Sequence, residues 1–260
     1  MMRCWIAYSR EDLETNGFFA ERMAEHGRDL GMDVSVVVTD DLPSGIPDIM
    51  INRSRDWALA KRMESQGTAV FNSSEVSRIS NDKFETYRLA DRLGVPHMEC
   101  SLPGEKLPAG PPWVVKSRTG HGGTEVFLTY SERGVAELCG TVDDPLVQST
   151  ADLGRDMRVY VLDGKVLAAV MRSSDKDFRA NYKLGGSIEL CEPTPDVERM
   201  VEAVCSELRP TMVGIDFVFS NGKALINEIE DAVGTRMLYS LTELDPARLL
   251  METVHSKMSL

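Results

Sequence analysis

The 260 residues include 41 acidic and 29 basic side chains, for a formal net charge of -12, and 42% of the chain is hydrophobic. This balance is typical of a globular protein and excludes an intrinsically disordered chain. The negative charge argues against a protein that binds the phosphate backbone of nucleic acids, because such proteins usually carry a basic surface.

The sequence shows no membrane or export signal. No apolar run approaches the roughly 20 residues that a membrane helix needs, and the opening stretch MMRCWIAYSRED becomes polar too early for a signal peptide. The five cysteines are scattered without a C-x-x-C pair, which is typical of reduced thiols. We therefore expect a cytoplasmic protein with no membrane partner.

The first 80 residues predict a small α/β lobe. CWIAY is a short apolar strand, residues 18–30 carry apolar side chains at near-helical spacing, and MDVSVVV is a strand with three consecutive valines. A strand–helix–strand order favours parallel strands joined by a crossover helix. We place a lobe boundary near residue 80.

A helix with clear start and stop signals follows this boundary. Ser80 or Asn81 can cap its first turn, and Gly94 with Pro96 just beyond ends it. The Pro- and Gly-rich segment 102–112 then predicts a loop before the strand WVVK.

The last third of the chain predicts two β-hairpins with a helix between them. The first hairpin turns at Asp163-Gly164 and the second near Asn221-Gly222, and Thr194 can cap the intervening amphipathic helix. The overall class is α/β, with an α+β C-terminal half. We divide the chain into an N-terminal lobe 1–80, a central lobe 81–146 and a C-terminal lobe 147–260.

The second hairpin carries three acidic residues, Asp216, Glu228 and Glu230. A two-residue Asn-Gly loop would pair Asp216 with Asn227 and turn both glutamates to the other face. A three-residue loop with Gly222 in the left-handed position would place all three carboxylates on one face. Three carboxylates so close would repel unless a hard cation lies among them, which predicts a metal site; the alternative is a solvated acidic face.

A lysine and a glycine-rich stretch are suited to phosphate. Lys116 ends the strand WVVK, and Gly120, Gly122 and Gly123 follow it. Backbone N–H groups can approach a phosphate closely there while the ammonium neutralises its charge. The pattern matches neither a Walker loop nor a dinucleotide fingerprint, so a plain loop is the alternative.

A basic cluster follows the first hairpin. It consists of Arg172, Lys176, Arg179 and Lys183, with Asn181 among them. Such a cluster can clamp a phosphate or a carboxylate, and arginine can do so with two hydrogen bonds. The alternative is a surface loop in which these cations balance Asp175 and Asp177.

Taken in order, these segments resemble the ATP-grasp ligases, and among them the RimK-like group most closely. The matching stretches are FNSSEVSRISNDKFETYRLADRLGVP, WVVKSRTGHGG, LVQSTADLGRDMRVYVLDGKVLAAVMR, DFRANYKLGG and VGIDFVFSNGKALINEIE. The resemblance implies an ATP-grasp fold, in which a small N-terminal α/β lobe precedes two lobes that clasp ATP.

The resemblance also implies roles for residues at matching positions. Lys83 and Lys116 match residues that bind the phosphates of ATP, and the loop of Gly120, Gly122 and Gly123 matches the loop that closes over them. Gln148, Ser149 and Thr150 match the segment that contacts adenine, and Asp156 matches the residue that holds the ribose. Arg172, Arg179 and Asn181 serve phosphate and the reacting acyl group, with Arg172 and Lys116 as the catalytic pair. Asp216, Glu228 and Glu230 match ligands of Mg²⁺, for which Mn²⁺ can substitute.

Two positions and one segment depart from the family pattern. Glu230 stands where an asparagine is usual, and Glu125 stands where the loop commonly has another glycine. The segment DAVGTRMLY differs from the usual run of small residues and proline, which predicts unusual acceptor recognition.

The implied reaction joins a carboxylate to an amine through an acylphosphate, with Arg172 stabilising the oxyanion of the second step. A small-molecule or peptide carboxylate and an amine or amino acid such as glutamate are the expected partners, and the resemblance is compatible with a homodimer. The alternatives are a non-catalytic nucleotide-binding module and an ATP-grasp kinase.

Overall fold

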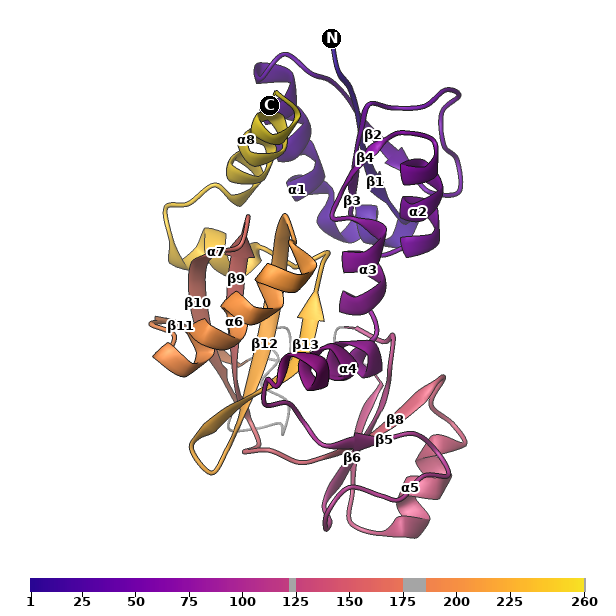
Figure 1. Ribbon diagram of the computed structural model, residues 1–260, viewed down its shortest axis with the longest axis vertical. Helices are drawn as coiled ribbons and strands as arrows, with labels where there is room; N and C mark the ends of the chain where they lie inside the picture. Colours follow the sequence, from indigo (N-terminus) through magenta and orange to yellow (C-terminus); the bar gives the residue numbers. More distant parts are fainter. Residues whose placement is uncertain (122–124, 175–185, 260) are drawn as a thin grey trace.

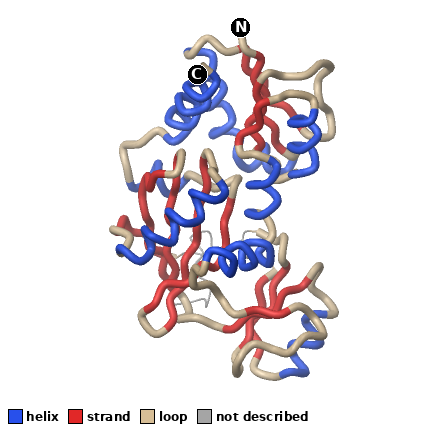
Figure 2. The backbone as a smooth tube through the Cα atoms, in the orientation of Figure 1, coloured by secondary structure: helices blue, strands red, loops and turns tan. Residues whose placement is uncertain are grey.

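The structure is a computed structural model, and it describes residues 1–121, 125–174 and 186–259. Three sheets follow one another along the long axis of the molecule, with both chain termini at the end occupied by the N-terminal sheet (Figure 1). Figure 2 shows the strands as three groups with helices packed against them. Within the residues described, no helix is both long and apolar enough to cross a membrane.

The N-terminal sheet has four parallel strands in the order β2-β1-β3-β4. Its elements are β1 (Arg3–Tyr8), α1 (Arg10–Asp29), β2 (Asp33–Val38), β3 (Ile49–Asn52), α2 (Trp57–Ser65) and β4 (Ala69–Phe71). The expected parallel pairing across a crossover helix is confirmed. The helix begins earlier than residue 18, because Ser9 caps it by accepting a hydrogen bond from the Asp12 N–H.

The largest sheet has five antiparallel strands in the order β11-β10-β9-β12-β13. They are β9 (Arg155–Leu162), β10 (Lys165–Ser173), β11 (Ser187–Cys191), β12 (Met212–Ser220) and β13 (Lys223–Glu230). The predicted first hairpin is confirmed, since Leu162 pairs with Lys165 and both turn residues have positive φ. The predicted helix is α6 (Pro195–Leu208), capped by Thr194.

Helices cover both faces of this sheet. On one face lie α6 and α4 (Lys83–Leu93), whose apolar side chains join Val159, Ile215 and Phe217 in one buried cluster. On the other face, Tyr160, Val170 and Met212 belong to a cluster that also contains α1, α7 (Arg236–Leu241) and α8 (Pro246–Met258). The N-terminal sheet and the five-stranded sheet therefore share one hydrophobic core.

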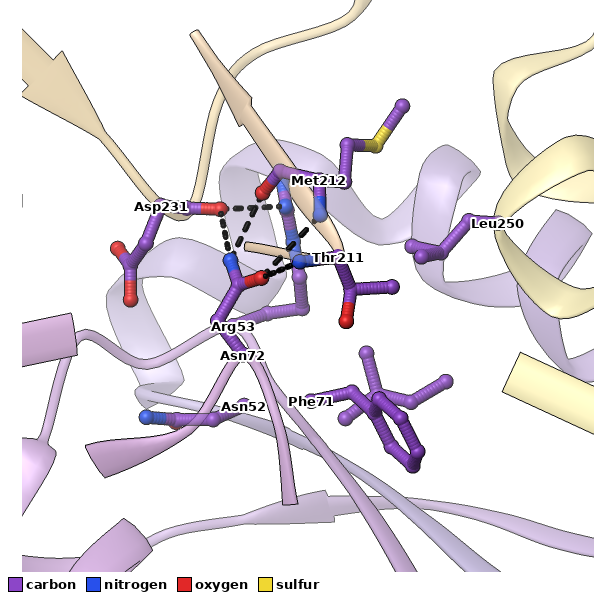
Figure 3. Close-up of a pocket in the computed structure, with 9 residues that line it drawn as sticks. Asn52, Arg53, Phe71, Asn72, Thr211, Met212, Asp231 and Leu250 are labelled. Carbon is purple, nitrogen blue, oxygen red and sulfur yellow. Dashed lines mark hydrogen bonds between the residues drawn. The ribbon is translucent and has the colours of Figure 1, made fainter. Parts of the chain in front are cut away.

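Two buried polar side chains cross the junction between these sheets (Figure 3). Asn72 accepts hydrogen bonds from the Thr211 and Met212 N–H groups and donates to the Met212 carbonyl. Arg53 donates to the carbonyls of Asp231 and Val233. Beside them lies a cavity of about 10 Å³, roughly the room that one water needs.

The third sheet has the order β5-β8-β6-β7 and a small core of its own, formed by Trp113, Val115, Val135, Val142 and Val147. Its elements are β5 (Cys100–Ser101), β6 (Trp113–Ser117), β7 (Val126–Thr129), α5 (Glu132–Cys139) and β8 (Pro145–Ser149). Strand β8 includes residue 147, so the lobe boundary predicted near that residue lies within a strand of this sheet.

The helix predicted after Ser80 is α4, and its N-cap differs from the expected one. Asp82, not Ser80 or Asn81, accepts hydrogen bonds from the N–H groups of the first turn. Ser80 cannot do so because it is the last residue of another helix, α3 (Ser74–Ser80). The predicted end is confirmed, since Gly94 adopts the left-handed conformation at the C-cap.

Candidate active site

Three carboxylates meet on one face of the β12–β13 hairpin. One oxygen each of Asp216, Glu228 and Glu230 lies within 4.8 Å of the others. Asp216 is only 1% exposed, whereas the two glutamates are partly exposed. The predicted grouping on a single face is therefore confirmed.

The loop that joins the two strands is not the expected one. Ser220 pairs with Lys223, so the loop has the two residues Asn221-Gly222, both with positive φ. Asparagine followed by glycine favours this two-residue turn because both residues tolerate the left-handed conformation. Of the two loops weighed from the sequence, the two-residue one is present, and the three-residue loop on which the shared face depended is not.

A β-bulge brings the carboxylates together instead. Phe217 pairs with Ile226, but the next pair is Asp216 with Glu228, so Asn227 has no counterpart on β12. One extra residue in a strand inverts the alternation of side chains beyond it. The bulge thus moves both glutamates to the face of Asp216.

Two arginines hold Asp216 in place. Arg158 donates to both of its carboxylate oxygens, from Nε at 2.7 Å and Nη2 at 2.6 Å. Arg172 Nη2 donates to it at 2.7 Å, and Arg172 Nε also donates to Asp156. Burial raises the pKa of Asp216, but the two guanidinium groups lower it more, so its pKa lies well below the ordinary value.

Arg158 is a site residue that sequence reasoning missed. It lies directly opposite Asp216 across β9 and β12, and its Nη2 also reaches Glu230 Oε1 at 2.7 Å. The available signal was a charged side chain inside the otherwise apolar run MRVYVL, because an arginine in a buried strand needs a buried partner.

Two lysines lie beside the carboxylates, and their contact with phosphates stays a prediction. Lys83 Nζ is 3.2 Å from Glu228 Oε2 and donates to the Gly120 carbonyl. Lys116 Nζ donates to Asn227 Oδ1 at 3.0 Å and to Tyr87 Oη at 3.3 Å. Burial, reinforced by the positive charge of Lys83, lowers the pKa of Lys116 to about 7.

The remaining predicted residues divide into two groups. Gln148 is buried beside Tyr87, the Ser149 N–H donates to the Glu99 carbonyl, and Thr150 Oγ1 donates to the Pro112 carbonyl. Contacts of Gln148, Ser149 and Thr150 with adenine stay a prediction. Gly122, Gly123, Arg179 and Asn181 lie outside the residues that the structure describes.

The donor set fits a divalent cation. Asp216, Glu228 and Glu230 supply hard oxygen ligands from one face of a hairpin, as Mg²⁺ and Mn²⁺ require. Arg158 offsets part of their charge by pairing with Asp216 and Glu230, while the ion pair of Glu228 among the residues described is with Lys83. Glu228 is therefore the carboxylate most available to a metal.

Comparisons with known proteins give a matching family and several relatives. A family model for the RimK-like ATP-grasp domain matches residues 104–254. An uncharacterised protein of Mycoplasma genitalium is 26% identical and covers 96% of this chain and 91% of its own length. A protein of Marinomonas sp. named as a probable alpha-L-glutamate ligase is 27% identical, with 91% of each chain covered.

Solved structures show the same fold. D-alanine–D-alanine ligase from Bacillus anthracis superposes with a TM-score of 0.77 at 14% identity, and covers 100% of this chain and 98% of its own. The ATP-grasp ligase PsnB, in a complex with a precursor variant, Mg and ADP, gives a TM-score of 0.72 at 17% identity, with 99% of each chain covered.

Proposed function

The chain belongs to the RimK-like ATP-grasp family, and on that premise we propose that it is an ATP-dependent ligase that joins a carboxylate to an amine. The observation that carries the proposal is the convergence of three carboxylates, two lysines and Arg172 at one site. This set can hold a metal–nucleotide complex beside an arginine that faces the reacting groups.

Each residue has a part in binding. Lys83 and Lys116 would bind phosphate oxygens, and the loop that contains Gly120 would cover them. Gln148, Ser149 and Thr150 would contact adenine, with Asp156 at the ribose and Arg179 and Asn181 at the phosphates. Asp216, Glu228 and Glu230 would hold Mg²⁺, which when bound offsets the negative charge of the transferring phosphoryl group.

The proposed reaction has two steps, formation of an acylphosphate and its conversion to an amide. An oxygen of the substrate carboxylate attacks the γ-phosphorus, the bond to the β-phosphate oxygen breaks, and ADP leaves. The amine then attacks the acyl carbon, and phosphate departs from the tetrahedral intermediate while the amine loses a proton to solvent. Arg172 donates hydrogen bonds to the oxyanion of that intermediate.

Substrate class and organisation follow from the same premise. We infer that the amine is an amino acid such as glutamate, added to a small-molecule, peptide or protein carboxylate, since a relative is named as a probable glutamate ligase. We further propose a cytoplasmic homodimer, with lobes 1–80, 81–146 and 147–260.

The test is to trap the intermediate. The purified protein is incubated with ATP, Mg²⁺, hydroxylamine and a panel of carboxylic acids, and hydroxamate and ADP are measured. A hydroxamate is expected, because hydroxylamine attacks an acylphosphate. ADP without hydroxamate would identify a kinase, and bound ATP that is never hydrolysed across acids and amines would identify a nucleotide-binding module.

Arg172→Ala is expected to lower turnover by about 10²–10³-fold, the usual cost of an oxyanion donor, with little change in ATP affinity. Turnover and calorimetric ATP binding are measured together. Arg172→Lys, which keeps the charge, controls for the loss of the ion pair with Asp216. If Arg172→Ala weakened nucleotide binding but left turnover at saturating ATP unchanged, the assigned role would be wrong.

ATP affinity is expected to fall as the pH rises above about 7, where free Lys116 loses its proton. Phosphate stabilises the charged form, so binding above that pH requires proton uptake and weakens by up to about tenfold per pH unit. Calorimetry between pH 6 and 9 measures this slope. In Lys116→Arg the side chain stays charged over this pH range, so any change of ATP affinity with pH that remains comes from other groups, such as ATP itself. Equal slopes of affinity against pH in the variant and the wild type would contradict the prediction.

A further inference from the structure

The β-bulge in the acidic hairpin has a second effect, on the side chain of Asn227. The extra residue of a bulge is released from the regular alternation of the strand. Asn227 uses that freedom to reach β6, where its Oδ1 accepts a hydrogen bond from Lys116 Nζ at 3.0 Å. The residue next to Glu228 thus contacts the lysine proposed to bind phosphate.

Asn227 is the centre of a buried polar network. Its Oδ1 also accepts from Gln148 Nε2 at 3.4 Å, and its main-chain oxygen lies 2.8 Å from Tyr87 Oη. Tyr87, Lys116 and Gln148 are each at most 5% exposed. The network therefore joins α4, β6 and β8 to β13 and fixes the direction in which the ammonium group points.

The hydrogen-bond acceptors around Lys116 are neutral. They are the Asn227 amide and the Tyr87 hydroxyl. Among the residues with described positions, no carboxylate forms an ion pair with Lys116, because Glu228 pairs with Lys83 and Asp216 pairs with two arginines. A buried ammonium without an ion-pair partner is costly, so an anion that enters the site and contacts it is favoured by the charge it supplies.

We propose that Asn227 is a positioning residue that aims Lys116 at a nucleotide phosphate and, by being an amide rather than a carboxylate, leaves the ammonium charge unpaired for that phosphate. This inference rests on the proposed nucleotide site. Asn227 itself does not touch the reacting atoms.

Asn227→Asp is the decisive variant, because it keeps the size of the side chain and places a carboxylate beside Lys116 Nζ. The new ion pair competes with phosphate, so calorimetry is expected to show ATP·Mg²⁺ binding weakened by about 10–100-fold, the worth of a charge-assisted hydrogen bond. KM for ATP should rise more than kcat falls. Asn221→Asp, the same change in the exposed turn of the same hairpin, should bind like the wild type.

Proton uptake separates positioning from general damage to the fold. At pH 8 the wild type is expected to take up protons as ATP binds, measured by calorimetry in buffers of different ionisation enthalpy, because Lys116 is largely neutral beforehand. Asn227→Asp should abolish that uptake, since its Lys116 is already charged. Asn227→Leu should weaken binding to a similar degree yet keep the uptake.

The outcomes are distinguishable. A wild-type protein that binds no ATP with Mg²⁺ would refute the proposed function itself. A wild type that binds ATP, with Asn227→Asp unchanged in both affinity and proton uptake, would overturn the role of Asn227 alone. If Asn227→Asp does not fold, as judged by thermal melting, Asn227→Leu with wild-type affinity would overturn the role as well.

Discussion

Glu228→Gln is expected to lower turnover by about 100-fold or more and to weaken divalent-cation binding by a similar factor. Glu228 is one of the two partly exposed carboxylates, and none of the described arginines pairs with it. A neutral amide there removes charge from the metal site and leaves Lys83 without its partner. The change in volume is negligible, so the fold should be kept.

Two measurements check this prediction. Steady-state turnover gives the loss of activity, and Mn²⁺ binding followed by electron paramagnetic resonance gives metal affinity without any need for substrate. Glu189→Gln, the same change on the exposed edge strand β11, is the matched control. Wild-type Mn²⁺ affinity in Glu228→Gln would remove Glu228 from the metal site.

Arg158→Met should destabilise the protein by about 3–5 kcal/mol, the usual cost of breaking a buried ion pair from one side. The guanidinium bridges Asp216 and Glu230, and it is almost fully buried. Methionine fills the space but leaves two carboxylates with less positive charge between them. The loss appears in the free energy of unfolding.

Chemical denaturation measures this loss from the shift of the midpoint at constant slope. Arg133→Met is the control, because Arg133 forms an exposed ion pair within α5 and its loss should cost no more than about 0.5 kcal/mol. Adding Mg²⁺ should recover part of the stability of Arg158→Met, since a bound cation replaces the missing charge. A free energy of unfolding equal to that of the wild type would contradict the structural role of Arg158.

Features set by neighbouring residues could be predicted from sequence. The Asp163-Gly164 turn, the cap of α6 at Thr194 and the end of α4 at Gly94 all follow from local backbone preferences. The predicted N-cap of α4, Ser80 or Asn81, lies one or two residues before the observed cap, Asp82. All three side chains are able to cap a helix, and the choice among them depends on where the preceding helix α3 ends.

Features set by distant residues could not be predicted in the same way. The three carboxylates were grouped correctly but through the wrong loop, since no local signal marks the bulge at Asn227. Arg158 was missed because its partners lie 58 and 72 residues further along the chain. Alternation along a strand predicts which side chains share a face only while the register is unbroken.

The N-terminal sheet and the five-stranded sheet share one core, which limits the part of the molecule that can move as a separate lobe. Asn72 fastens the N-terminal sheet to the start of β12, Arg53 fastens it to the segment just beyond Glu230, and α8 packs on α1, so these parts form one base around a shared core. The β5–β8 sheet has its own small core and joins the base through the cluster around Tyr87, Met98 and Leu146 and through the hydrogen bonds of Asn227. Closure over the proposed nucleotide would therefore be a rotation of this sheet, and Lys116 would move with it relative to Asp216, Glu228 and Glu230.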